Sequence, residues 1–296
     1  MQIQESFLDE SAACLYVCST PIGNLQDVSL RLLQVLRDAD VIAAEDTRQT
    51  RKLLTHFEIH PRLLTSYHLH NEKSKEQELE HWWAEGKKVA LVSDAGTPGV
   101  SDPGFGAVRA AIDMGIPVIP VPGASASIAA LISSGLRPQP FLFIGFLPKG
   151  QGDRRKLLEQ YQSLDATLVI YESPHRLAKT VADLDLLFAH RQLVLAKELT
   201  KKYETFARGT ASEVKDFLLT HAPRGEYVIV VGPPSDIETQ ENEEAKKEES
   251  DAVWQEAVAI VEERVEKGMR HKQAVEQVAA QFGIKKRQLY QATLRK

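Results

Sequence analysis

The sequence predicts an α/β protein with two sheet-and-helix domains. Its first two thirds alternate short runs rich in β-branched residues with amphipathic stretches, which is typical of layered sheets and helices rather than of a bundle or an all-β sandwich. The chain has 296 residues, of which 43% are hydrophobic and 26% charged. That length allows two or three domains with a sizeable core.

The elements of the first predicted domain follow from local patterns. Leu30, Leu33 and Leu36 lie at helical spacing, and Asp27 to Ser29 before them can cap that helix. The apolar runs between such stretches have the length and composition of buried strands. We expect strands at 15–18, 41–44, 63–67, 89–92, 117–121 and 141–144, and further helices at 72–84, 105–114 and 124–134.

A second set of elements follows a hinge rich in Gly, Pro and Lys at 147–152. We expect strands at 167–171, 192–196, 204–207 and 227–231, and helices around 154–162, 177–188 and 212–221. The predicted organisation is a first α/β domain at 13–146, a second at 147–232, an acidic linker at 233–251 and a helical module at 252–296.

The net charge of −5 is distributed unevenly along the chain. Eight acidic residues and two lysines lie between 235 and 251, and this stretch, which cannot bury apolar surface, predicts a disordered or loosely helical tether. From 264 to 296 nine Lys or Arg stand against two Glu. A helix at 272–281, a turn at Gly283 and a basic helix at 285–294 resemble a helix-turn-helix, although a solvated module explains the pattern equally well.

Six polar loops, each after a predicted strand, indicate a ligand-binding cleft. In open α/β sheets the ligand crevice lies outside the carboxyl ends of the strands. Gly permits close backbone approach and Pro fixes the chain, so these loops read as shaped and stiff, while the alternative is that they are only turn formers. The loops lie at 19–24, 45–48, 93–104, 122–127, 171–176 and 197–202.

Several classes of site are not indicated by the sequence. It has no GxGxxG, GxxxxGK[ST], HExxH, paired CxxC or GxSxG motif, and the stretch His68-Leu69-His70 is more typical of a polar loop than of a metal site, so no metal site is expected. Cys14 and Cys18 read as small core residues in a reducing compartment. With neither a signal-peptide pattern nor an apolar run of about 18 residues, we expect a cytoplasmic protein.

Eight ordered motifs resemble one known family. They are Thr20-Pro21-Ile22-Gly23-Asn24-Leu25, Ala44-Glu45-Asp46-Thr47-Arg48, Ser93-Asp94-Ala95-Gly96-Thr97-Pro98, Ser101-Asp102-Pro103-Gly104, Pro122-Gly123-Ala124-Ser125, Gly145-Phe146-Leu147-Pro148, Tyr171-Glu172-Ser173-Pro174-His175-Arg176 and Glu198-Leu199-Thr200-Lys201. Together they resemble the bacterial 16S ribosomal RNA (cytidine-2′-O)-methyltransferase family of the tetrapyrrole methylase superfamily. The resemblance implies two α/β domains with S-adenosylmethionine in the cleft between them, a homodimer, and 2′-O-methylation of a cytidine in the decoding region of the small ribosomal subunit.

The resemblance also implies the residues that hold the cofactor. The loop at 94–98 takes the place of the superfamily's GDP-type cofactor loop, and the loop at 122–125 that of its second adenosine-facing loop. The first loop departs from the superfamily's GxGPG-like turn. The expected cofactor-binding residues are Pro21, Asp94, Gly96, Thr97, Pro98, Ser101, Gly123, Ala124, Ser125, Leu147, Tyr171, Glu198 and Leu199.

Methyl transfer to a ribose hydroxyl requires a group that positions the hydroxyl or accepts its proton. The candidates are Glu45, Asp46, Glu172 and Lys197, and each of them reads equally well as a helix cap or an ion-pair member. The expected RNA-binding residues are Arg48, Arg51, Lys52, His175, Arg176, Lys285, Lys286 and Arg287.

Two other functions fit parts of the pattern. One is a C-methyltransferase that acts on a tetrapyrrole such as a cobalamin precursor, which would need a wide cleft but leaves the basic tail unexplained. The other is a nucleic-acid-binding regulator whose α/β body senses a metabolite.

Overall fold

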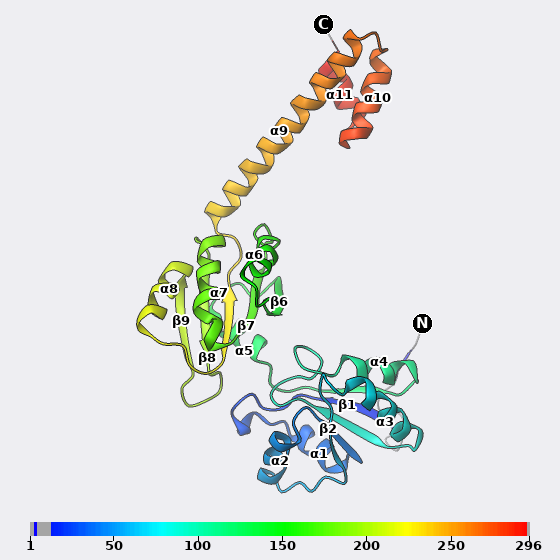
Figure 1. Cartoon of the computed structure of the whole chain (residues 1–296), viewed down its shortest axis with the longest axis vertical. Coiled ribbons are helices and arrows are strands. Elements are labelled where there is room, and N and C mark those ends of the chain that lie inside the picture. Colours follow the sequence, from blue (N-terminus) through cyan, green and yellow to red (C-terminus); the bar gives the residue numbers. More distant parts are fainter. Residues whose placement is uncertain (1–2, 5–12, 295–296) are drawn as a thin grey trace. The chain divides into compact units, whose positions relative to one another are not determined.

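The computed structural model describes residues 3–4 and 13–294, and for 236–250 only the backbone. The chain forms two compact units, one up to Pro233 and one from Pro234 onward. The first unit contains two five-stranded sheets, which confirms the predicted α/β class with two sheets (Figure 1).

The first sheet is entirely parallel, with the strand order β3-β2-β4-β1-β5. Parallel strands need covered faces, and these strands are accordingly continuous apolar runs. The strands are β1 (Cys14–Cys18), β2 (Val41–Ala44), β3 (Leu64–Ser66), β4 (Lys88–Val92) and β5 (Val118–Val121).

Helices cover both faces of this sheet. On one face, Leu36 of α1 (Leu30–Asp38) and Leu54 of α2 (Thr47–His56) join one buried cluster. On the other, α3 (Glu72–Ala84) and α4 (Phe105–Asp113) bury a second cluster that includes Trp83. Ser29 caps α1 as expected, because its hydroxyl accepts a hydrogen bond of 3.0 Å from the Leu32 amide.

The connections of the first sheet reverse direction between β1 and β4. From β1 the chain leads through α1 toward β2, and from β4 it leads through α4, on the opposite face, toward β5. Such a reversal opens a crevice at the carboxyl ends of the two strands, which is where ligands bind in open α/β sheets. The fold therefore places the loops at 19–24 and 93–104 at the favoured position for a site.

The second sheet is mixed, with the order β6-β7-β10-β8-β9. Only β6 and β7 pair in parallel, and the other three pairs are antiparallel. The strands are β6 (Phe141–Phe146), β7 (Thr167–Glu172), β8 (Gln192–Lys197), β9 (Thr205–Thr210) and β10 (Tyr227–Val231).

The prediction that strand 141–144 belongs to the first sheet is wrong, because β6 pairs with β7 in the second. The helix before it, α5 (Ala126–Ser134), packs on the second sheet as well, where Leu131 joins the cluster of Val169 and Val230. On the opposite face lie α6 (Gln151–Glu159), α7 (Pro174–Leu187) and α8 (Ala211–Thr220). The chain therefore crosses between the sheets at the loop before α5.

The second unit is helical. It comprises α9 (Asp236–Glu266), α10 (His271–Phe282) and α11 (Lys286–Thr293), with a core that includes Val261, Val275 and Leu289. The predicted turn is present: Gly283 ends α10 in the left-handed conformation, with φ of 64°. The acidic stretch expected as a tether forms part of the backbone of α9.

Candidate active site

A cavity of about 420 Å³ lies in the first unit, where loops of the first sheet face one end of the second. It is lined by Ile22, Glu45, Asp94, Ala95, Gly96, Thr97, Val100, Ser101, Asp102, Ser125, Ala126, Phe146, Tyr171, Glu172, Ser173, Pro174, Ala196, Leu199, Glu226, Tyr227 and Val228. The structure thus brings residues from all six predicted loops together. We call this space the central cavity.

Backbone hydrogen bonds fix the loop after β4 to the loop after β1, at the point where the connections of the first sheet reverse direction. The Thr20 amide donates to the Gly96 carbonyl at 2.8 Å, and the Gly96 amide donates to the Thr20 carbonyl at 3.1 Å. Gly96 adopts φ of 85°, a conformation that residues with a Cβ rarely take. The hydroxyls of Ser19 and Thr97 share a further bond of 2.8 Å. The loop is therefore held in one shape before any ligand arrives.

Gly123 makes a close approach between two loops possible. A Cβ at this position would lie 2.9 Å from the Ser19 carbonyl oxygen, which is too close for any other residue. The Thr97 hydroxyl reaches the Ala124 carbonyl at 3.4 Å from the other side. Gly123 and Ala124, expected as cofactor contacts, thus shape the wall, and Ser125 next to them lines it.

Carboxylates of two neighbouring loops are linked to one another through backbone amides. The Asp94 amide donates to Glu45 Oε2 at 3.2 Å, and the Asp46 amide donates to Asp94 Oδ1 at 3.0 Å. Burial, and then the nearby Asp46 charge, raise the pKa of Asp94 above its ordinary value. These two hydrogen bonds hold the loops after β2 and β4 together, and Glu45 and Asp94 line the central cavity from them.

Asp46, a catalytic candidate, has a structural position instead. Its carboxylate caps α2 by accepting from the Arg48 amide at 2.8 Å, and it pairs with the Arg48 guanidinium at 2.6 Å. These bonds lower the pKa of Asp46 to about 2. Asp46 is not among the residues that line the central cavity.

Asp102 lines the central cavity and was not among the sequence candidates. Burial, followed by repulsion from Glu45 and Asp94, raises its pKa to about 6. Perturbed carboxyls of this kind concentrate at functional sites. The sequence offered one sign of this role: Asp102 is the second Asp of the loop that follows β4, two residues before Gly104.

The second sheet contributes an aromatic wall. The Tyr171 ring lies edge-on to Phe143 and Phe146, with centroids 4.9 and 5.7 Å apart. Its hydroxyl accepts a bond of 3.1 Å from the Ser127 amide, at the start of α5. Phe146 itself is 58% exposed, which leaves an aromatic face uncovered beside the cavity. Tyr171, expected as a cofactor contact, thus lines the cavity, and so does Phe146, which was not among the expected residues.

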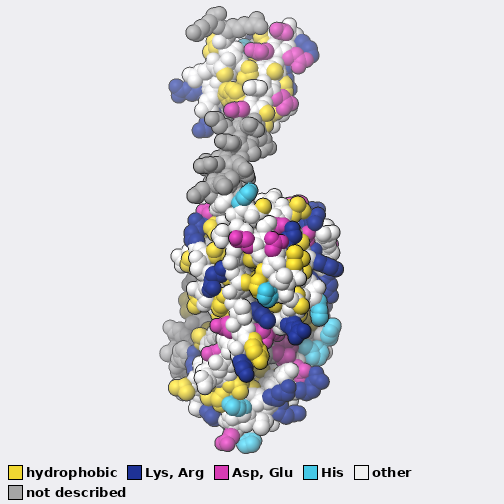
Figure 2. Space-filling model, turned by 90° about the vertical axis from the view of Figure 1, so that its left-hand side faces the viewer, with side chains coloured by type: hydrophobic (Ala, Val, Ile, Leu, Met, Phe, Trp, Pro, Cys, Tyr) yellow, Lys and Arg dark blue, Asp and Glu magenta, His cyan; other side chains and the backbone are white. Residues whose placement is uncertain are grey.

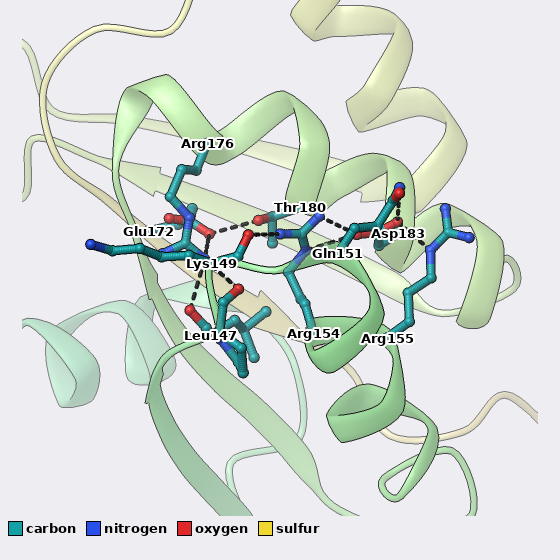
Figure 3. A network of polar contacts seen from close by, with 10 residues as sticks. Leu147, Lys149, Gln151, Arg154, Arg155, Glu172, Arg176, Thr180 and Asp183 are labelled. Carbon is teal, nitrogen blue, oxygen red and sulfur yellow. Dashed lines mark hydrogen bonds and ion pairs between the residues drawn. The ribbon is translucent and has the colours of Figure 1, made fainter.

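Glu172 and Arg176 belong to a buried polar network (Figure 3). The Glu172 carboxylate accepts from the Thr180 hydroxyl at 2.6 Å and from the Ser173 amide at 2.8 Å, and lies 3.4 Å from Arg176. Arg176 also donates to the Leu147 carbonyl at 2.7 Å. These contacts tie the hinge to α7, and they favour a positioning role for Glu172 over proton transfer.

A second part of the same figure shows Asp183 between two arginines. Arg154 and Arg155 contact opposite oxygens of its carboxylate at 2.5 and 2.6 Å. Burial alone would raise the pKa of Asp183, but the hydrogen bonds from Arg155 and Arg154 lower it. This charged group is fully partnered inside the second sheet's helical layer.

The residues after β8 divide between different roles. Leu199 lines the central cavity, whereas Glu198 accepts from the Glu226 amide at 2.9 Å and from Lys201 at 3.2 Å and so closes its own loop. Lys197 lines a separate cavity and not the central one.

Three further residues expected to hold the cofactor are not among those that line the central cavity. Pro21 borders a small neighbouring cavity, Pro98 is absent from the lining, and Leu147 is 2% exposed in the apolar core. The predicted RNA-binding side chains outside the network are exposed: Arg48, Arg51, Lys52, His175, Lys285, Lys286 and Arg287. Figure 2 shows Lys and Arg side chains beside recessed acidic side chains on one face of the first unit.

The central cavity fits the predicted cofactor, S-adenosylmethionine. Its volume lies within the range of small-molecule sites, and it combines an aromatic wall with fixed backbone groups and five carboxylates, of which Glu45, Asp94 and Asp102 come from loops of the first sheet. Backbone groups of the 94–97 loop suit the neutral parts of a nucleoside, and Glu45, Asp94 and Asp102 suit a cationic group. Among the residues whose side chains the structure describes, no cluster of His, Cys, Asp or Glu is arranged to hold a metal ion. The described helices include none with the length and apolarity needed to cross a membrane.

Comparison with known proteins defines the class. The family model for tetrapyrrole (corrin/porphyrin) methylases matches residues 14–215. The fold resembles the methyltransferase CobJ (TM-score 0.58, 20% identity, covering 75% of this chain and 95% of that one). It also resembles a Thermus thermophilus uroporphyrin-III C-methyltransferase complexed with S-adenosylhomocysteine (TM-score 0.53, 17% identity, covering 74% and 97%). The fold and the site thus define a methyltransferase of the tetrapyrrole methylase type.

Curated relatives narrow this class further. The chain is 44% identical to ribosomal RNA small subunit methyltransferase I of Halalkalibacterium halodurans over 98% of both proteins, and 42% identical to that of Bacillus subtilis over 94% of this chain and 93% of the relative. The chain therefore belongs to the ribosomal RNA small subunit methyltransferase I family of tetrapyrrole methylases, as the sequence motifs predicted. The predicted cofactor, S-adenosylmethionine, is confirmed by this membership.

Proposed function

We propose that this protein methylates the ribose 2′-hydroxyl of a cytidine in the decoding region of 16S ribosomal RNA. Its family membership supports methylation of small-subunit RNA by S-adenosylmethionine. The observation that carries the finer assignment is the trio Glu45, Asp94 and Asp102 in the central cavity, because a ribose hydroxyl, a weak acid, needs a nearby group to hold it and take its proton.

The chemistry is an in-line displacement, in which orientation supplies much of the catalysis. When bound, S-adenosylmethionine supplies a methyl group on a positively charged sulfur. The backbone of the 94–97 loop, together with Ser125, Tyr171 and Leu199, would hold the cofactor.

Asp102 accepts the proton of the hydroxyl in this proposal, and Glu45 orients the hydroxyl. A pKa of about 6 makes the Asp102 carboxylate a stronger base than an ordinary aspartate, while it stays mainly ionised at neutral pH. Glu45 has one oxygen fixed by the Asp94 amide at 3.2 Å. As the hydroxyl proton passes to Asp102, the oxygen would take the methyl group, whose bond to sulfur would break and leave the sulfur as a neutral thioether.

The basic helical unit would contact the RNA backbone. Lys285 and Arg287 are exposed at the start of α11, and Lys286 lies 2.8 Å from Glu276. Phosphate contacts of this kind position RNA without reading its sequence. In the first unit, Arg51 and Lys52 on α2 would contact phosphates of the RNA as well.

The substrate of this proposal is a ribosomal particle in the cytoplasm, and the enzyme acts as a homodimer. Support for the dimer comes from α5, where Ile128 and Ile132, four residues apart, are 43% and 72% exposed. Large exposed apolar groups on one helix face are typical of association surfaces.

The proposal is tested by methyl transfer from labelled S-adenosylmethionine. Purified protein is offered small ribosomal subunits, free 16S RNA and uroporphyrinogen III in parallel, and the RNA product is mapped by mass spectrometry. We expect label on the ribose of one cytidine of the small-subunit RNA. Label on a base would reject the 2′-O assignment, and label on the macrocycle alone would make the protein a tetrapyrrole methyltransferase. Glu45→Gln should reduce the RNA signal, and Glu159→Gln, at an exposed position of α6, is the matched control.

A further inference from the structure

A second cavity of about 340 Å³ lies on the other face of the second sheet. Lys197 and Thr205 line it, and Tyr227 lines both this cavity and the central one. The register places Lys197 opposite Tyr227 on one side and opposite Thr205 on the other, so the three residues form a row at one end of the sheet. We call this space the side cavity. It begins at the sheet end that faces the central cavity.

The side cavity combines two cations with an apolar floor. Lys197 and Arg224 border it, and within the described part of the chain neither has a carboxylate within 4.0 Å. The nearest loop acids are already engaged, because Glu226 pairs with Lys201 at 2.7 Å and Glu198 with the same lysine at 3.2 Å. Two positive charges are therefore left for an anion.

The floor and one wall of the side cavity suit a flat ring. Leu195 and Ala207 supply apolar surface from β8 and β9. Phe217 and His221 stack face to face at the end of α8, with centroids 4.1 Å apart and planes 13° apart. Nucleic-acid bases stack on such rings, and stacking tolerates any base because every base has a π face.

A ligand that fits these features carries a phosphate and a planar ring, as a nucleotide does. We propose that the side cavity binds a nucleotide of the RNA substrate that lies beside the target nucleotide in the strand. The inference rests on the proposed function, and it assigns Lys197 to holding the RNA rather than to proton transfer. Tyr227, common to both cavities, stands between the two nucleotides, and the Arg224 amide donates to its hydroxyl at 3.3 Å.

The test compares Lys197→Ala/Arg224→Ala with Lys156→Ala/Lys179→Ala in the full-length protein. The control pair removes two equally charged side chains from exposed positions of α6 and α7 on the same sheet. Binding of purified 16S RNA is measured at several salt concentrations, alongside methyl-transfer kinetics and calorimetry with S-adenosylmethionine. Lys197→Arg/Arg224→Lys, which keeps both charges, is the rescue variant.

We expect the RNA KM of Lys197→Ala/Arg224→Ala to rise at least about tenfold. The slope of log affinity against log salt should fall by about 1.4, because Lys197 and Arg224 would each contact one of the two phosphates that flank the bound nucleotide, and each lost single-strand phosphate contact accounts for about 0.7. The S-adenosylmethionine dissociation constant and the control pair should match the wild type. The rescue variant should recover most of the slope. Arg224→Ala alone should give about half of the change in slope.

Three results would overturn the proposal. The first is a KM and a salt slope equal to those of the control pair. The second is a collapse of kcat with unchanged RNA affinity, which would return Lys197 to the chemistry. The third is saturable binding of free cytidine 5′-monophosphate that is lost when both cations are removed, together with a salt slope of RNA binding that does not change. That result would assign the cavity to a free nucleotide and not to the RNA. A reduced slope in a protein that methylates no RNA would reject the proposed function and keep the cavity assignment.

Discussion

Two aspartates of the first unit, the buried Asp183 and the half-buried Asp102, have opposite surroundings. Asp183 lies between Arg154 and Arg155, with each carboxylate oxygen bound, and its pKa is lowered. Asp102, in the central cavity, meets other acids, and its pKa is raised to about 6. The contrast teaches that a charged group with all its partners stabilises the fold, whereas a carboxylate left among like charges is available to a ligand or a proton.

The largest effect is expected from breaking the partnered group. Arg154→Ala leaves Asp183 buried without one of its cations, and removal of one member of a buried pair costs about 3–5 kcal/mol. The free energy of unfolding in urea measures this loss. The exposed pair of Arg109 and Asp113 on α4 is the control, and Arg109→Ala should cost at most about 0.5 kcal/mol. Equal losses would contradict the contrast.

The next effect concerns the acids of the central cavity. Asp94→Ala removes a carboxylate that faces the cofactor position and accepts from the Asp46 amide. We expect the dissociation constant for S-adenosylmethionine to rise about 10- to 100-fold, as for loss of a charged hydrogen-bonding group worth about 1.5–3 kcal/mol. Isothermal calorimetry measures it, with Asp113→Ala as the control. An unchanged constant would remove Asp94 from the site.

The pH dependence of the reaction separates Asp102 from its neighbours. Protonation below about pH 6 removes the proton acceptor, so the rate should fall up to about tenfold for each pH unit below that point. Steady-state kcat measured between pH 5 and 8 should show this fall as the acidic limb of the pH–rate profile. Asp102→Asn should lower kcat and abolish the limb, whereas a limb that persists in this variant would assign the proton to another group.

The smallest effect is a gain in stability from the same substitution. The folded-state pKa of Asp102 lies above its ordinary value, so its ionised form costs stability, and the cost appears as pH rises from about 4 to above 6. Asp102→Asn should therefore raise the melting temperature by a few degrees at pH 8 and leave it unchanged near pH 4. A gain that is independent of pH would show that charge is not its cause.

Local patterns in the sequence were enough to predict most elements. The helix expected at 72–84 is α3, and the strand expected at 227–231 is β10, because periodicity and flanking turns act within a few residues. The sheet to which β6 belongs could not be predicted, since it depends on where α5 packs. The roles of Glu172 and Lys197 could not be predicted either, because Glu172 bonds Thr180 only once α7 has packed, and Lys197 is placed by the pairing of β8 with β10, opposite Tyr227.

The loops of the candidate site could also be predicted from local patterns, whereas its full set of carboxylates could not. Glycines and prolines after strands indicated the loops, and the order of motifs indicated the cofactor. Asp102 was missed because its pKa comes from burial and from Glu45, which is distant in sequence. Motif order therefore finds the loops of such a cavity, and only the folded chain shows which carboxylates share it.

A crystal structure of the protein with S-adenosylhomocysteine and cytidine tests the central claim most directly. We predict the nucleoside cofactor against the 94–97 loop, with its sulfur on the side of Asp102 and Glu45 and the ribose hydroxyl within hydrogen-bond distance of a carboxylate. Both molecules bound elsewhere, with the acids of the central cavity in contact with neither, would contradict it.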